Sequence, residues 1–314
     1  MPLEKKYGKA TRDAYGEALV ELGKENSSVV VLDADLSKST KTAKFGETFP
    51  DRFFNVGIQE ANLVGVASGL AAAGKIPFIS SFATFLMSKG FDQMRMAVAF
   101  SECNVKMVGT HGGISIGEDG ASQMSIEDFA LAAALPGVAV IGPADEFSAR
   151  DLIKEAANYP HPVYVRVGRP KAPLIYNKQG VAKIGKANRL REGKDVSIVA
   201  NGLLVFEALS AAETLAAEGI QASVVDLHTI KPLDEALLVE EAKKGRMVVA
   251  EEHQIWGGVG SAVARFLAGA HPCKMEFVAI NDTFAESGAP DEVMEKYGMT
   301  AQGIVRAVKK VLSK

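Results

Sequence analysis

Short runs of apolar residues alternate along the first half of the chain with longer segments of helical periodicity. Continuous apolar runs are typical of parallel strands buried on both faces. The alternation therefore predicts an α/β fold with a mainly parallel sheet. The expected strands are residues 28–34, 75–82, 104–110, 137–143 and 162–168, and the expected helices lie near residues 9–25, 60–73, 87–102, 126–135 and 145–157.

The pattern changes after residue 168. Residues 169–195 are basic, polar and interrupted by Pro and Gly, which is typical of a linker with room for a hairpin. A second series of apolar runs follows, and the chain ends in an expected helix near residues 301–313. We therefore expect two αβα domains with mainly parallel sheets, at 1–170 and 194–314, joined by a linker at 171–193. The strands expected in the second domain are residues 195–201, 222–228, 246–252 and 275–280.

Composition excludes several classes of protein. The chain has 314 residues, 47% of them hydrophobic, and a formal net charge of −3, so it can bury a sizeable core. No basic block indicates a nucleic-acid partner, and no apolar run is long enough for a membrane span or a secretory signal. Cys103 and Cys273 form no metal-type pair, and we expect reduced thiols in a cytoplasmic protein.

The segment GIQEANLVGVASGLAAAG, residues 57–74, predicts a buried helix of small and apolar residues with Glu60 in its first turn. A carboxylate at this position has a structural explanation, because amide dipoles leave the start of a helix partly positive. The alternative is that Glu60 faces a ligand. This segment alone leaves both explanations open.

The segment GTHGGISIGEDGASQMSIED, residues 109–128, follows an expected strand and precedes an expected helix. In an open parallel sheet this is the carboxyl end of a strand, where ligands bind, and its glycines let the backbone approach another group closely. The structural alternative is a polar loop ending in a helix cap, with Ser125 as the cap residue and Asp128 three residues later. Its other polar side chains are His111, Glu118, Asp119, Ser122 and Gln123.

Two further sets of residues have both a structural and a functional explanation. Phe82 and Phe85 lie where a strand gives way to a helix, and they suit either the core or a stacking wall for a flat heterocycle. Arg12, Ser39 and Arg169 are scattered, and only the fold can decide whether they converge on a phosphate. The motifs of P-loop proteins, zinc proteases, serine hydrolases and dinucleotide-binding folds are missing from the sequence.

In combination these segments resemble transketolase over essentially the whole chain, but only the C-terminal half of the usual enzyme. The SIGEDGxSQM stretch is similar to the branch of the family that includes the mammalian enzymes. The segments that carry the resemblance are KATRDAYGEAL, GIQEANLVGVASGLA, PFISSFATFLMSKGFDQMRMA, THGGISIGEDGASQMSIED, IKPLD and EEHQIWGGVGSAV.

The resemblance implies the pyrimidine-binding domain of a thiamine diphosphate enzyme, followed by the C-terminal domain of the family. The diphosphate-binding domain, with its GDG…N motif, is absent from the sequence. The chain thus resembles the C-terminal subunit of a split, two-chain transketolase. The resemblance implies a separate N-terminal subunit that holds most of the Mg²⁺ (or Ca²⁺) site, and an α2β2 assembly acting on sugar phosphates in the pentose phosphate pathway.

The resemblance also assigns residues to the cofactor. Glu60 matches the glutamate that activates thiamine diphosphate, and Phe85 matches the aromatic residue that stacks on the aminopyrimidine, with Phe82 beside it. Gln123 stands where many members have a histidine, and we group it with the cofactor-binding residues. Asp35 lies in a matching segment but receives no role.

Other matching residues are assigned to the substrate. Arg12, Ser39 and Arg169 match the clamp for the sugar phosphate. His111 and Asp119 match residues that hydrogen-bond the sugar hydroxyls, and Asp119 is expected to contact the C2 hydroxyl of the acceptor. With Glu60, these two form the expected catalytic group.

The implied reaction is the transfer of a two-carbon ketol unit from a ketose phosphate to an aldose phosphate by way of thiamine diphosphate. The alternative is the β subunit of a thiamine diphosphate-dependent 2-oxo acid dehydrogenase, which has the same two domains but lacks the GEDGxSQM loop and the phosphate clamp. The C-terminal part of a deoxyxylulose-phosphate synthase is a further relative. A non-enzymatic partner with the same fold would be expected to have lost its site residues.

Overall fold

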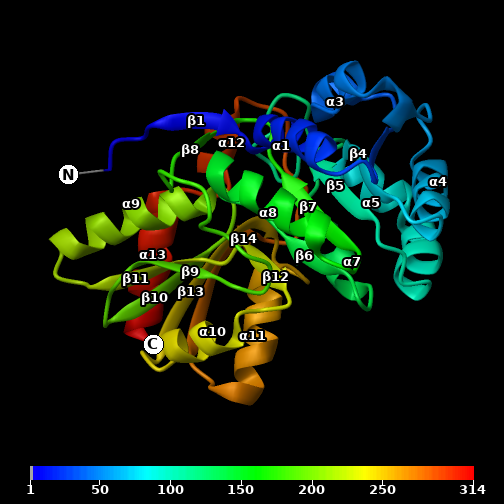
Figure 1. The fold of residues 1–314 in the computed structure, drawn as a ribbon. Coiled ribbons are helices and arrows are strands. Elements are labelled where there is room, and N and C mark those ends of the chain that lie inside the picture. The colour runs from blue at the N-terminus through cyan, green and yellow to red at the C-terminus, as the bar shows by residue number, and fades with distance from the viewer. Residues whose placement is uncertain (1–2) are drawn as a thin grey trace.

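The computed structural model describes residues 3–314, so residues 1 and 2 of the expected first domain lie outside it. Strands and helices alternate along most of this range (Figure 1). The strands are β1 (Tyr7–Ala10), β2 (Val29–Asp33), β3 (Phe53–Asn55), β4 (Ile76–Phe82), β5 (Lys106–Thr110), β6 (Ala139–Ile141), β7 (Val163–Val167), β8 (Lys171–Pro173), β9 (Asn188–Arg191), β10 (Val196–Ala200), β11 (Ala222–Asp226), β12 (Thr229–Lys231), β13 (Arg246–Gln254) and β14 (Lys274–Ile280). The helices are α1 (Thr11–Glu25), α2 (Ser37–Thr40), α3 (Ala43–Thr48), η1 (Pro50–Arg52), α4 (Glu60–Ala72), α5 (Ala83–Lys89), α6 (Phe91–Gln93), η2 (Met94–Phe100), α7 (Asp128–Ala134), α8 (Glu146–Asn158), α9 (Leu204–Ala217), α10 (Glu235–Ala242), α11 (Val259–Ala270), α12 (Pro290–Lys296) and α13 (Ala301–Ser313).

Every strand expected from an apolar run is present, and the predicted α/β class with mostly parallel sheets is confirmed. The prediction of one helix at 87–102 was wrong, because this region is divided into α5, α6 and the π-helical η2. The short strands β1, β3, β8, β9 and β12 were not expected. Each has four residues or fewer, and none consists of a continuous apolar run.

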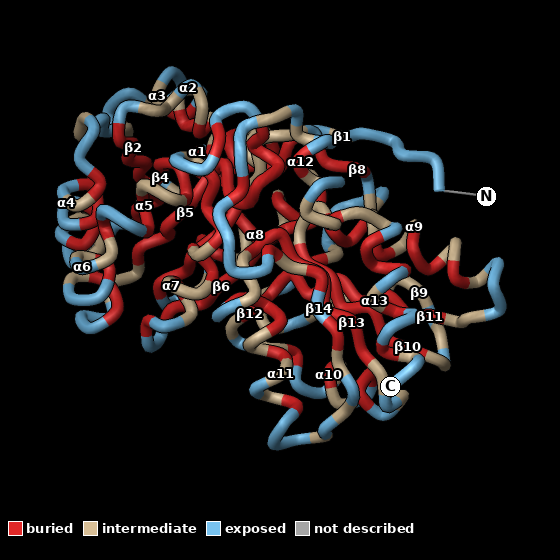
Figure 2. Tube along the Cα trace, turned by 180° about the vertical axis from the view of Figure 1, so that it is seen from behind, coloured by how far each residue is buried: buried red, intermediate tan, exposed pale blue. Residues whose placement is uncertain are grey.

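The first sheet of the described chain has the strand order β12-β6-β7-β5-β4-β2-β3, and all its pairs are parallel except β12 with β6. Helices α1, α3 and α8 pack on one face, around the buried side chains of Tyr15, Phe45 and Leu152. Helices α4, α5, α7 and η2 pack on the other face. The central strands β2, β4, β5 and β7 are almost wholly buried, as continuous apolar runs predict (Figure 2).

The second sheet has the order β14-β13-β10-β11-β9, with β9 antiparallel at one edge. Helices α9 and α13 cover one face, and α10 and α11 cover the other. Both halves are therefore three-layered αβα units.

Strand pairing crosses the expected domain boundaries. β12 follows β11 in sequence but pairs with β6, so it extends the first sheet with a strand from the second half (Figure 1). β8 pairs with β1, whereas β9 belongs to the second sheet. Within the described residues, the expected linker thus forms strands of two different sheets and no hairpin of its own.

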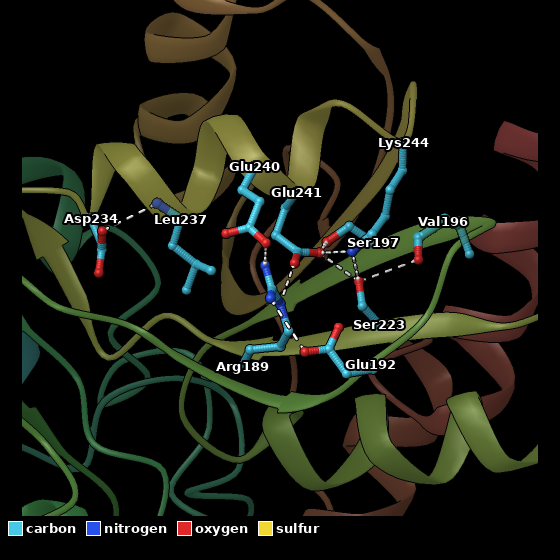
Figure 3. A network of polar contacts seen from close by, with 10 residues as sticks. All are labelled: Arg189, Glu192, Val196, Ser197, Ser223, Asp234, Leu237, Glu240, Glu241 and Lys244. Atoms are coloured by element: carbon cyan, nitrogen blue, oxygen red, sulfur yellow. Dashed lines mark hydrogen bonds and ion pairs between the residues drawn. The ribbon is translucent and has the colours of Figure 1, made fainter.

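A buried carboxylate fixes β9 to the second half (Figure 3). Glu241 accepts hydrogen bonds from Arg189 Nε at 2.6 Å and from Ser197 Oγ at 2.7 Å, and also from Ser223 and Lys244. Burial alone would raise its pKa, but these donors hold the pKa below its usual value. Glu241 therefore has a structural role, tying α10 to three strands.

Candidate functional site

Glu60 is the first residue of α4, yet it does not face water. Its side chain is buried, with 2% of the residue exposed, and Ser81 Oγ donates a hydrogen bond to its Oε1 at 3.1 Å. Ser81 lies near the carboxyl end of β4, so the carboxylate is placed where ligands bind in an open parallel sheet. No protein donor contacts Glu60 Oε2 within residues 3–314, and that oxygen is free to accept or share a proton.

Phe82, the residue after Ser81, belongs to a stack of aromatic rings. The rings of Phe82 and Phe85 stack at an interplanar angle of 14° with centroids 5.6 Å apart, and the centroid of Phe82 lies 3.8 Å from that of the His111 ring. Phe82 is buried, whereas Phe85 is half-buried with Lys89 Nζ 4.7 Å from its ring centre. The structure thus brings both predicted phenylalanines beside the Glu60 hydrogen-bond partner and leaves part of one ring open.

His111 follows β5 with a positive φ of 60° and is 3% exposed. Arg12 Nη1 lies 2.7 Å from its Nε2, and Thr110 Oγ1 lies 2.7 Å from its Nδ1. A guanidinium only donates, so Nε2 must accept and Nδ1 carries the proton that is donated to Thr110. Burial and the charges of Arg12, Arg169 and Lys41 lower the pKa of His111 to about 3, which keeps the ring neutral at physiological pH.

Positive charges gather around this histidine. Arg12 also donates to the carbonyl of Ser39 at 3.1 Å, and burial together with nearby Arg169 lowers its pKa. Arg12 Nε is buried and has no hydrogen-bond partner among residues 3–314. An unpaired buried donor is costly, and an anionic ligand would satisfy it. The structure therefore brings the predicted clamp residues Arg12, Ser39 and Arg169 to one region.

The glycine-rich segment is only partly joined to this cluster. Arg169 Nη1 donates to the carbonyl of Ile116 at 2.6 Å and pairs with Glu118 at 3.1 Å. Asp119 is exposed and Gln123 is half-buried. No side-chain hydrogen bond joins either of them to the rest of the cluster in the described structure.

The helix cap predicted at Ser125 was wrong. Helix α7 begins at Asp128 with Glu127 at the cap position, and the buried Ser125 Oγ lacks a hydrogen-bond partner in the described range. Asp128 instead accepts from Arg166 Nε at 2.8 Å and from Tyr164 OH at 2.6 Å. This buried ion pair serves tertiary packing, which the local spacing of Ser and Asp could not reveal.

Sequence reasoning missed Ser81 and Thr110, which hold Glu60 and His111 by hydrogen bonds. Both lie inside apolar strands, and no local signal distinguishes them from other strand residues. Asp35, left without a role, has a positive φ of 65° and accepts from Asn55 Nδ2 at 3.0 Å, so it shapes the turn after β2.

A cavity of about 920 Å³ lies between the halves, apart from this cluster, and no predicted site residue lines it. Residues 3–314 contain no group of three or more His, Cys, Asp or Glu arranged to hold a metal ion, and no helix of theirs is long and apolar enough to cross a membrane. Cys103 and Cys273 are both free thiols.

Family models define the class of protein. Residues 8–173 match the transketolase pyrimidine-binding domain, and residues 185–304 match the transketolase C-terminal domain. The chain belongs to the transketolase family, whose members depend on thiamine diphosphate.

Three similar proteins match this chain over nearly its whole length. A solved structure described as a split gene transketolase, an inactive β4 tetramer, has 50% sequence identity and a TM-score of 0.92, covering 98% of this chain and 99% of that one. A protein of Methanocaldococcus jannaschii, provisionally named a transketolase C-terminal section, is 44% identical over 98% of this chain and 97% of its own length. A Clostridium protein, the 6-deoxy-6-sulfo-D-fructose transketolase subunit SqwH, is 42% identical over 96% and 94%.

The chain thus corresponds to the C-terminal section of transketolase, as its sequence motifs predicted, and it is similar over nearly its whole length to a chain of a split transketolase. Human transketolase is 38% identical over 97% of this chain, but the chain spans only 49% of the human protein.

Proposed function

We propose that this chain is the catalytic C-terminal subunit of a two-chain transketolase. It transfers a two-carbon ketol unit from a ketose phosphate to an aldose phosphate, together with an N-terminal subunit that carries the diphosphate-binding domain. The observation that carries the proposal is the buried Glu60 carboxylate, held beside the Phe82–Phe85 stack and close to a cationic cluster around His111.

The residues present fit the aminopyrimidine ring of thiamine diphosphate. Glu60 Oε2 has no donor within the described chain, so it can share a proton with a ring nitrogen, while Ser81 fixes the other oxygen. The half-buried Phe85 offers a face on which a flat ring can stack. When bound, the cofactor supplies the carbanion equivalent that attacks the donor carbonyl. Gln123 is assigned to the same pocket, and Mg²⁺ or Ca²⁺ is assigned mainly to the partner subunit.

The substrate phosphate is assigned to Arg12, Ser39 and Arg169. The unpaired Nε of Arg12 supports this assignment, because a phosphate oxygen would satisfy it. His111 stays neutral, so a change in pH above its low pKa does not alter its hydrogen-bonding role. The exposed Asp119 is free to contact a sugar hydroxyl. Binding energy at the phosphate then orients the reacting end of the sugar.

An assembly with a second kind of chain is supported by the relatives. The similar split-gene chain is described as an inactive tetramer of β subunits, whereas human transketolase contains a further half. Exposed apolar side chains on α4, on the adjacent η2 and just before α4 support self-association within an α2β2 assembly. These residues are Ile58, Val66, Met96 and Phe100.

The domain boundaries 1–170, 171–193 and 194–314 and the cytoplasmic location stay predictions. The dehydrogenase alternative is not favoured, because both family models and the relatives named above are of the transketolase type.

The test is reconstitution. We expect the purified chain alone to be inactive, and activity on xylulose 5-phosphate plus ribose 5-phosphate to appear when the product of a neighbouring reading frame, thiamine diphosphate and Mg²⁺ are added. The donors should include 6-deoxy-6-sulfo-D-fructose, since one relative is named for it. Turnover by the isolated chain would refute the two-chain proposal, and turnover of pyruvate with a lipoyl carrier instead of sugars would establish the dehydrogenase alternative.

A further inference from the structure

The glycine loop, residues 112–126, belongs to the first half by sequence but is packed in the core of the second. Four of its apolar side chains are buried in one cluster with residues of β10, β11, β13, α9 and α13. The loop therefore cannot move independently of the second half without breaking that core. The four residues are Ile114, Ile116, Met124 and Ile126, all less than 5% exposed.

Polar contacts from β13 support the same loop. The backbone N–H of Ser115 donates to Glu252 Oε1, and the backbone N–H of Gln254 donates to the carbonyl of Ile126 at 2.8 Å. Gly113, with a positive φ of 84°, lies so close to Glu252 that a methyl group there would overlap its carboxylate. Glu252 thus fixes the beginning of the loop by a hydrogen bond and by direct contact.

The tip of the loop rests on the segment that leads into α12. A methyl group on Gly117 would lie 2.7 Å from Pro290 Cγ, and one on Gly120 would overlap Ser287 Oγ. Asp119 lies between these two glycines in the sequence. From the first half, Arg169 contacts the carbonyl of Ile116. The tip is therefore held between the two halves.

We propose that the C-terminal half positions the acceptor-binding end of the site, with Ser287 and Glu252 as positioning residues. This inference rests on the function proposed above. Ser287 contacts the backbone at Gly120 and thereby determines the position of the nearby Asp119 side chain. Glu252 holds the beginning of the loop, after His111, in place. Displacing a positioned polar group by about 1 Å can cost on the order of 100-fold in rate, so a small change behind the loop should be felt at the sugar.

Within residues 3–314, no side-chain hydrogen bond or ion pair joins Glu60, Ser81 or Phe85 to the segment 284–290. A change at Ser287 should accordingly affect the acceptor sugar and spare the cofactor. This separates positioning of the loop from general damage to the fold.

The experiment uses the assembled two-chain complex with Ser287→Leu. Ser287 is exposed, so the variant should fold, and its larger side chain would push against Gly120. We expect the KM for the aldose phosphate acceptor to rise at least tenfold, with the thiamine diphosphate Kd and the melting temperature unchanged. Ser287→Thr should give a smaller rise. The matched control is Glu286→Leu, because the neighbouring Glu286 points to Lys296 instead of the loop.

Hydrogen exchange gives a readout without substrate. Glu252→Ala should speed exchange of the Ser115 amide and of neighbouring loop amides, whereas Glu252→Gln keeps an acceptor oxygen and should restore protection. The inference is overturned if the acceptor KM is unchanged in Ser287→Leu, or if it rises equally in Glu286→Leu. In either case, wild-type activity on sugar phosphates would still support the proposed function. If the wild-type complex itself fails on sugar phosphates, the proposed function fails, and unchanged loop exchange in Glu252→Ala would then overturn the anchoring separately.

Discussion

At the scale of single residues, Glu60 has one role in its helix and a second role in the tertiary structure. Glu60 has the local role expected of an acid in a first helical turn. In the fold it is also buried beside Ser81 and near the Phe82–Phe85 stack. The two roles are compatible, because the helix end that favours a carboxylate points toward the carboxyl edge of the sheet.

Glu60→Gln tests the functional role. The amide oxygen can still accept from Ser81, but the side chain would lack the acidic proton that the proposed function assigns to it. We expect kcat of the assembled complex to fall by roughly 10² to 10⁴, the range typical of a lost acid–base group. Steady-state kinetics check this, with Glu218→Gln as the control, because Glu218 is a surface partner of Lys309. Wild-type kcat in Glu60→Gln would favour a non-catalytic role for the chain.

At the scale of elements, α4 has two distinct faces. Leu63, Val64 and Ala67 are fully buried against the first sheet. Gly65 and Val66 are exposed on a helix that is almost without charge after its first residue. An exposed apolar helix face is typical of an interface between subunits.

Val66→Asp tests that face. A carboxylate there would be buried without a partner if α4 packs against another copy, so we expect self-association to weaken by about 100-fold or more. Analytical ultracentrifugation measures the change in assembly. Gln302→Asp adds the same charge at an exposed position of α13 and should leave the assembly unaltered. An unchanged assembly in Val66→Asp would exclude α4 from the interface.

At the scale of the whole molecule, buried polar groups join the two halves. Asn201, after β10, donates to the carbonyl of Gly142 at 3.0 Å, and β12 completes the first sheet. Asp226, at the end of β11, accepts from Tyr176 OH at 2.7 Å. Burial raises the pKa of Asp226 from its ordinary value of 3.8 to about 7, and the nearby carboxylate of Asp145 adds to the rise.

This shift predicts how stability depends on pH. The folded chain keeps the Asp226 proton up to about pH 7, whereas the unfolded chain releases it near 3.8. Folding therefore binds a proton between these values, and the contribution of Asp226 to stability is lost as pH rises from 4 to 7. Asp226→Asn removes this loss. We expect the difference in free energy of unfolding between Asp226→Asn and the wild type to increase in favour of the variant as pH rises from 4 to 7. The increase should be on the order of a few kcal/mol.

Denaturant unfolding at a series of pH values measures this difference. Asp51→Asn, an exposed site, should follow the wild-type curve at every pH. A constant difference between Asp226→Asn and the wild type from pH 4 to 8 would show that Asp226 does not titrate as its burial predicts.

Most of the fold could be predicted from the sequence because long buried strands leave a strong apolar signal. The edge strands could not, since β9 and β12 are short and their partners lie far away in the chain. Motif resemblance supplied the candidate site residues, but it could not supply their contacts. Thr110 and Ser81 lie within apolar strands, and their roles depend on what β4 and β5 place beside them.

The sequence by itself determined the α/β class, the order of the main elements and the transketolase relationship, because these depend on local periodicity and on the spacing of motifs. Only the tertiary structure decided that Arg12 contacts His111 and that the glycine loop is packed in the second half. Those contacts join residues about 70 or more positions apart, and they exist only once two sheets and the strands between them fix the distances.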